Sequence, residues 1–128
     1  MQIYEVKNTL LGFENISKVE IHEIDDLFST MQNIENEKIS FTIVNPYLLR
    51  EYSFDLPIDI KILLDINEKS NVSVYNIAVI QEPLENSAIN FLAPIIVNND
   101  NNTIAQAILN KVSHPEFGMA ETIKTFRE

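Results

Sequence analysis

The feature that most constrains this fold is an apolar run at residues 90–98, which a proline divides and an asparagine closes at each end. Proline lacks a backbone N–H and restricts the residue before it, so Pro94 disfavours an uninterrupted central strand. We therefore expect a bend at a strand edge, with residues 95–97 continuing as a strand. Asn90 and Asn98 suit the flanking turns because a short amide can bond nearby backbone groups. The pattern predicts a packed corner of a β domain and requires no catalysis.

Three further segments have the alternation or composition of strands. Residues 39–44 place Ile39, Phe41 and Ile43 on one face and stop at an Asn-Pro turn. Residues 19–24 come close to the same alternation. Residues 72–80 are rich in β-branched and aromatic side chains and carry little charge, which predicts a buried strand.

Other segments leave their structure open. Residues 27–32 fit a strand or one helical turn, and residues 103–109 mix alanines that favour a helix with isoleucines that suit a strand. Residues 57–64 open with a proline at a plausible first helical position, which favours a short helix, although their isoleucines leave a strand possible. Residues 98–102 predict a tight connection between two antiparallel strands. The weakly patterned residues 113–128 are expected to form a peripheral C-terminal tail.

Length and composition bound the domain organisation. The 128 residues suffice for one sizeable core, whereas two domains would each be too small. Hydrophobic residues make up 45% of the chain and charged residues 22%, which is ordinary globular composition. We therefore predict one mainly β domain over residues 1–128, mostly antiparallel, with one or two short helices.

The residues that common cofactor and metal sites require are scarce. The chain has no cysteine, and its two glycines, Gly12 and Gly118, exclude a phosphate-cradling loop, a dinucleotide fingerprint and a nucleophile elbow. His22 and His114 lack metal-ligand spacing. No cofactor or metal is predicted. The N-terminal residues do not resemble an export signal and no stretch is long enough for a membrane span, so we expect a cytoplasmic protein.

The charge balance bears on the kind of partner. Nine Lys and Arg against 19 Asp and Glu give a net charge of −10, which opposes direct binding to nucleic acid. The same field would speed association with a basic protein surface. Solubility is the competing explanation, and charge alone does not separate the two.

Acidic and aromatic side chains offer an alternative function. Paired carboxylates could serve a small hydrolase or a sugar-binding β domain: Asp25 with Asp26, Glu35 with Glu37, and Glu82 with Glu85. On exposed turns such carboxylates would be solvated, and nothing would shift their pKa values toward those needed for catalysis. Four aromatic residues could form a groove but are more typical of a core: Tyr47, Tyr52, Phe54 and Tyr75.

Residues 90–98 resemble the Asn-Leu-x-Ala-Pro-x-x-x-Asn signature of the FliW flagellar assembly factors. Further segments resemble the same family in the same order: Gly12-Phe13, residues 31–33, residues 39–46 ending in Pro46, residues 52–55, and Gln106 with Leu109. The motif residues expected to serve the fold are Gly12, Phe13, Pro46, Asn90, Leu92, Ala93, Pro94 and Asn98. Ala93, Ile95 and Val97 are expected to pack, and Pro94 and Asn90 to set the bend.

The resemblance implies a small, non-enzymatic β-barrel-like protein of the cytoplasm. Members of that family bind newly made flagellin and also a CsrA-type translational repressor, in competition. When flagellin is exported, the freed factor captures the repressor and relieves its hold on flagellin messenger RNA. A purely structural adaptor is the remaining alternative.

Candidate contact residues follow from charge and position. Glu82 and Glu85, on the turn before the motif, could meet basic residues of the repressor. The asparagine-rich loop offers an exposed contact through Asn98, Asn99 and Asp100. An apolar patch for the amphipathic helices of flagellin could come from Tyr47, Leu48 and Tyr52, which could instead close the bottom of the barrel.

Overall fold

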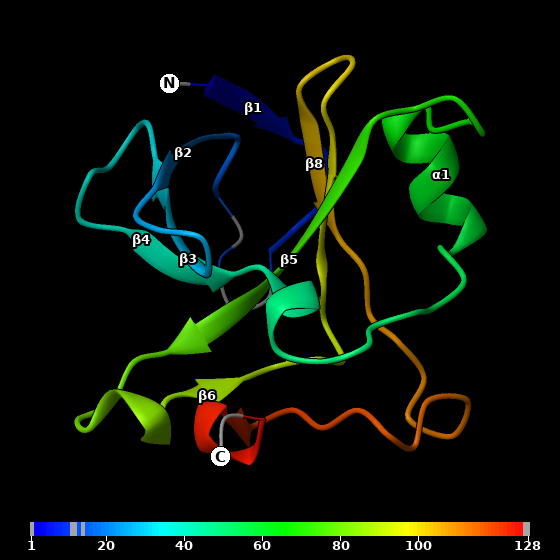
Figure 1. Ribbon diagram of the computed structural model, residues 1–128. Helices are drawn as coiled ribbons and strands as arrows, with labels where there is room; N and C mark the ends of the chain where they lie inside the picture. The colour runs from blue at the N-terminus through cyan, green and yellow to red at the C-terminus, as the bar shows by residue number, and fades with distance from the viewer. Residues whose placement is uncertain (1, 11–12, 14, 127–128) are drawn as a thin grey trace.

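The computed structural model describes residues 2–10, 13 and 15–126, and within them seven strands close a β-barrel (Figure 1). These strands are β1 (Gln2–Val6), β2 (Lys18–Glu23), β3 (Phe28–Asn33), β4 (Ser40–Val44), β5 (Val72–Val79), β7 (Ile95–Asn98) and β8 (Thr103–Gln106). Neighbours run antiparallel except β1 and β8, which are parallel. The mainly β class and the barrel implied by the resemblance are confirmed.

Two pairings close the ring. In the parallel one, the N–H of Glu5 donates to the carbonyl of Asn102 at 2.9 Å and the N–H of Lys7 donates to that of Ile104 at 2.8 Å. In the other, β4 pairs with β5 over three residues, with Thr42 opposite Ala78. Closure leaves these strands without the free edges that promote aggregation.

The strands predicted from alternation and composition are present as β2, β4 and β5. The two ambiguous segments, 27–32 and 103–109, contain strands β3 and β8. The loop at residues 98–102 joins β7 to β8, as predicted for a tight antiparallel connection. Asn102 there has a positive φ of 56°, a conformation that asparagine tolerates well.

Alternating side chains of the strands fill the barrel. Tyr4 lies opposite Val19, and Ile104 lies opposite Val97, with all four side chains buried. The same interior cluster contains Leu10, Ile16, Met31, Ile43 and Ile95. Burial of this apolar surface supplies the main favourable free energy for the barrel.

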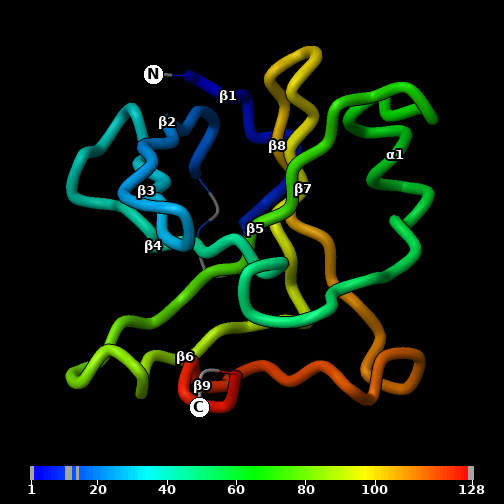
Figure 2. The backbone as a smooth tube through the Cα atoms, viewed as in Figure 1, coloured from blue at the N-terminus to red at the C-terminus, as the bar shows by residue number. Residues whose placement is uncertain are grey.

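Helix α1 (Ile58–Leu64) covers the outside of β7 and β8 (Figure 2). Its Ile60 and Leu64 pack with Ile96 and Ala105. The short helix favoured by the sequence is therefore present, with Pro57 as its N-cap rather than its first helical residue. Because α1 covers the outer face, β7 is buried on both sides, which explains its continuous apolar composition.

A second layer lies over the outer face of β4 and β5. It is built from the chain after η1 (Pro46–Leu48), the segment around η2 (Leu84–Asn86) and the C-terminal segment, together with β6 (Ala88–Ile89), which pairs with the end of β5. In that segment β9 (Glu121–Thr122) pairs with β6, and η3 (Ile123–Thr125) follows it (Figure 2). Phe117 and Ile123 are buried in this cluster, so the expectation of a peripheral tail is wrong for these residues.

Candidate functional site

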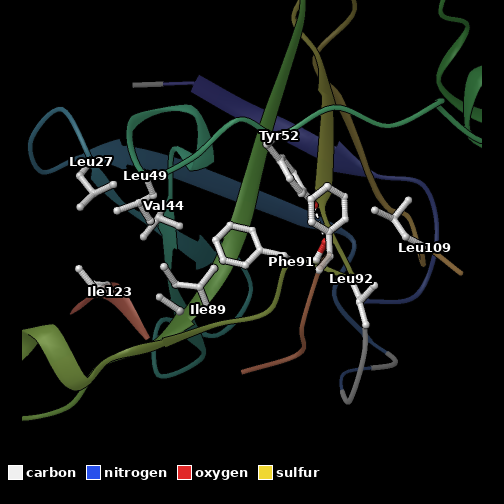
Figure 3. Packing of buried hydrophobic residues seen from close by; sticks show 11 residues of the cluster. Leu27, Val44, Leu49, Tyr52, Ile89, Phe91, Leu92, Leu109 and Ile123 are labelled. Carbon is white, nitrogen blue, oxygen red and sulfur yellow. Dashed lines mark hydrogen bonds between the residues drawn. The ribbon is translucent and has the colours of Figure 1, made fainter. Parts of the chain in front are cut away.

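A buried polar network holds the bend before β7. Tyr52 Oη donates to the carbonyl of Phe91 at 2.5 Å (Figure 3). Asn76 Nδ2 donates to Tyr52 Oη at 3.1 Å and to the carbonyl of Asn90 at 3.0 Å. Asn90 Oδ1 in turn accepts the N–H of Leu92 at 3.0 Å. The bend takes the carbonyls of Asn90 and Phe91 out of the hydrogen bonding between strands. Side chains supply their partners instead, because buried polar groups need hydrogen bonds.

The other side of the bend is tied to the chain at the end of β8. Gln106 Nε2 donates to the carbonyl of Ala93 at 3.0 Å, and the N–H of Ala107 donates to that of Pro94 at 2.9 Å. The bend set by Asn90 and Pro94 is therefore a fixed corner of the fold. The packing role expected of three apolar residues is confirmed by their burial: Ala93, Ile95 and Val97.

Tyr52 belongs to the core. Its side chain is 5% exposed, and its ring lies 4.7 Å from that of Phe117 and 5.5 Å from that of Phe91, measured between centroids. Burial raises the pKa of Tyr52 to about 12. The expectation that Tyr52 contacts a partner is wrong, because its hydroxyl and ring are used inside the protein. Tyr47 and Leu48, at 54% and 50% exposed, remain available at the surface.

A partly buried guanidinium stabilises the same cluster. The Arg50 Cζ atom lies 5.0, 4.9 and 5.2 Å from the ring centroids of Phe91, Phe117 and Phe126. Arg50 Nη1 also donates to Glu121 Oε2 at 3.0 Å. Cation–π contacts and an ion pair therefore fix the C-terminal segment against the bend.

Asn98 is also structural. It is 1% exposed, its Nδ2 donates to the carbonyl of Leu64 at 2.8 Å, and its Oδ1 accepts the N–H of Asp100 at 3.0 Å. The expected exposed contact at Asn98 is therefore wrong, because this side chain joins the β7–β8 turn to the end of α1. Asn99 is half-buried and bonds Ser73, whereas Asp100 is exposed.

The expected acidic turn lies on an exposed arm between β5 and β6, which projects from the barrel at the lower left of Figure 1. Glu82 and Glu85 are exposed there. Exposed apolar side chains accompany them at Val79, Ile80 and Leu84. We call these five residues the β5–β6 arm; its mixture of apolar and acidic groups is typical of protein-binding surfaces.

A groove of about 630 Å³ adjoins the arm near the first residues of β4. Phe41, Ile80 and Met119 line it together with Phe13, whose ring meets that of Phe41 edge-on at 4.9 Å. Gly12 lies outside the described residues. The sequence interpretation missed the groove, although the apolar residues ending the 72–80 segment were a signal for it.

One carboxylate in each of two of the predicted pairs has a local partner. Asp25 Oδ1 accepts the N–H groups of Leu27 and Phe28 at 2.9 and 2.7 Å, which caps the β2–β3 turn. Glu35 accepts the hydroxyl of Ser17. Within the described part of the chain, no three His, Asp or Glu side chains are arranged to hold a metal ion. No helix in that part is long and apolar enough to cross a membrane.

Comparison with known proteins places this fold in a family. The model of the FliW protein family matches residues 1–122. Flagellar assembly factor FliW 2 of Wolinella succinogenes is 48% identical over 123 residues, covering 96% of this chain and 90% of that protein. Flagellar assembly factor FliW of Sulfurimonas denitrificans is 44% identical over 123 residues, covering 96% of each chain.

A solved structure has the same fold. A crystal structure of the flagellar assembly factor FliW superposes with a TM-score of 0.87 at 20% identity, covering 98% of this chain and 86% of that one. The family-model match and the identity of the relatives, together with the Asn90 to Asn98 corner, lead to one conclusion. This chain belongs to the FliW family of flagellar assembly factors.

Proposed function

We propose that this chain is a cytoplasmic, non-enzymatic binding protein that holds flagellin and, in competition, a CsrA-type translational repressor. The observation that carries the proposal is the family match over residues 1–122, together with relatives named flagellar assembly factors. Release from flagellin frees the protein to capture the repressor, so flagellin export is coupled to translation of flagellin messenger RNA.

The β5–β6 arm is the proposed contact for the repressor. Glu82 and Glu85 are exposed and the chain carries a net charge of −10, which favours a basic partner. The exposed side chain of Leu84 lies between them in sequence and adds apolar area that charge alone would not supply. Steering by the carboxylates and anchoring by the apolar residues are complementary contributions to binding.

Flagellin requires an apolar surface for its amphipathic terminal helices. Tyr47 and Leu48 supply exposed apolar area after the Asn45-Pro46 turn, and the groove beside Phe41 supplies a concave one. Asn99 and Asp100 lie on the separate β7–β8 turn and are proposed as polar contacts. Amphipathic helices commonly bind by placing their apolar face in such grooves.

The test is a binding experiment with purified flagellin and purified repressor. Reversal of the arm charges in Glu82→Lys/Glu85→Lys should slow association with the repressor about tenfold at low salt and flatten its salt dependence. Glu37→Lys/Glu68→Lys reverses two other exposed carboxylates and serves as the control. Equal association rates for both variants would remove the arm from the site, and failure of the unmodified protein to bind either partner would overturn the function.

A further inference from the structure

The barrel end opposite the groove has a polar interior. On β3, Ser29 lies opposite Ile43 of β4 on one side and Glu23 of β2 on the other. Paired residues share a face of the sheet, and Ile43 belongs to the barrel interior. Ser29 and Glu23 therefore lie on the inner face of the sheet, with Ser29 buried and Glu23 exposed at the open end of the barrel.

A cavity of about 430 Å³ opens at this end. It is lined by Glu23, Asp25 and Asp26 at the β2–β3 turn, which are exposed, and by Ser29, Tyr4 and Tyr75. We call these six residues the acidic mouth. Its volume lies within the range of about 300–1,000 Å³ found for small-ligand pockets. No lysine or arginine is among the described residues that line it, so its carboxylates are not neutralised locally.

Two side chains that carry hydroxyls and line this cavity are largely buried. Ser29 is only 7% exposed and Tyr4 only 8%. Neither hydroxyl makes a hydrogen bond to any other described residue, although both side chains line the cavity. Neither hydroxyl is among the fully buried side-chain atoms that lack a partner in the described residues, so both reach the open cavity, where a ligand or water can bond them. Burial raises the pKa of the Tyr75 hydroxyl, and electrostatic interactions with Tyr4 and Glu23 raise that pKa further.

We propose that the acidic mouth binds a guanidinium group, with the carboxylates of Glu23 and Asp26 and the hydroxyl of Ser29 as acceptors. A compact metal ion does not fit, because the carboxylates of the described residues do not converge on one point. A guanidinium is planar, presents five donors to acceptors that are spread apart, and stacks on aromatic faces such as those of Tyr4 and Tyr75. One Asp25 oxygen is already used by backbone N–H groups, which leaves that residue mainly to shape the turn.

The test is a titration of the full chain with small probes, in which binding is measured by NMR chemical shifts. N-acetyl-arginine amide should bind saturably, with shifts centred on Tyr4, Ser29 and Tyr75, whereas N-acetyl-citrulline amide, its neutral analogue, should not bind. Glu23→Gln should weaken binding about tenfold, because it removes the charge of one of the two acceptor carboxylates. Glu37→Gln removes one exposed charge elsewhere and should bind as the unmodified protein does.

A second probe, free arginine, distinguishes a guanidinium on a polypeptide from one on a small metabolite. If N-acetyl-arginine amide and free arginine bind equally, the natural ligand is an arginine side chain of a polypeptide. If only free arginine binds, the natural ligand is a small metabolite. Either result supports a guanidinium site. Binding of the citrulline probe as tightly as the arginine probe, no saturable binding at all, or an unchanged affinity in Glu23→Gln would overturn it. The inference goes beyond the proposed function, and its failure leaves the flagellin and repressor tests unaffected.

Discussion

Removal of the Tyr52 hydroxyl tests whether the bend before β7 depends on its buried polar network. In Tyr52→Phe the ring remains, so packing against Phe91 and Phe117 is kept. The change deletes the 2.5 Å bond to the carbonyl of Phe91 and the 3.1 Å bond from Asn76 Nδ2. Asn76 retains its bond to the carbonyl of Asn90.

The magnitude follows from these two bonds. A net contribution of about 1 kcal/mol each, with the Phe91 carbonyl left buried and unpaired, gives a loss of about 2 kcal/mol in the free energy of unfolding. For a chain of this length, each kcal/mol shifts Tm by roughly 4 °C, so Tm should fall by about 8 °C. The effect is large because the hydroxyl is buried at a place where water cannot replace it.

Urea unfolding and thermal unfolding, both followed by circular dichroism, provide the measurement. Tyr47→Phe is the matched control, because Tyr47 is 54% exposed and surface substitutions of this kind change stability by less than about 0.5 kcal/mol. A Tyr52→Phe protein as stable as the control variant would refute the argument that this network secures the bend.

Two further predictions concern the same cluster. Arg50→Lys keeps the charge but loses the planar contacts with Phe91, Phe117 and Phe126, and should lower the free energy of unfolding by about 1–2 kcal/mol; an unchanged urea midpoint would contradict this. Above pH 10 the unfolded chain releases the Tyr52 proton while the folded chain keeps it until a pKa of about 12, so stability should fall across that window by on the order of 2 kcal/mol. Tyr52→Phe should remove the Tyr52 part of the alkaline loss and leave the part due to Tyr4, Tyr47 and Tyr75, whose pKa values burial also raises. An equal loss in the variant would contradict the assignment.

Local patterns predicted most of the secondary structure. Alternation at residues 39–44, the apolar run at 95–97 and the asparagine turn at 98–102 all correspond to elements of the barrel. Such signals come from residues that are neighbours in sequence. Their φ and ψ preferences and the period of their apolar side chains are local properties and do not depend on the tertiary structure. The segment 103–109 was ambiguous because its composition suits two conformations, and pairing with β7 decided between them.

The site residues were harder to predict. Tyr52 was expected to contact a partner, with a place in the fold as its alternative, and Asn98 was expected in an exposed loop, yet both are buried. Their partners lie far away in sequence: Tyr52 bonds a carbonyl 39 residues on, and Asn98 bonds one 34 residues back. Only the packing of the outer layer and of helix α1 against the barrel brings these groups together.

By itself the sequence determined the mainly β class, the bend at Pro94 and the acidic character of the protein, because these follow from residue types and their spacing. The tertiary structure alone decided which polar groups are buried, that the C-terminal segment completes the core, and that Glu23 and Ser29 share a cavity with Tyr4 and Tyr75. The physical reason is that burial and local field are properties of all neighbours in space, and barrel closure joins strands from both ends of the chain.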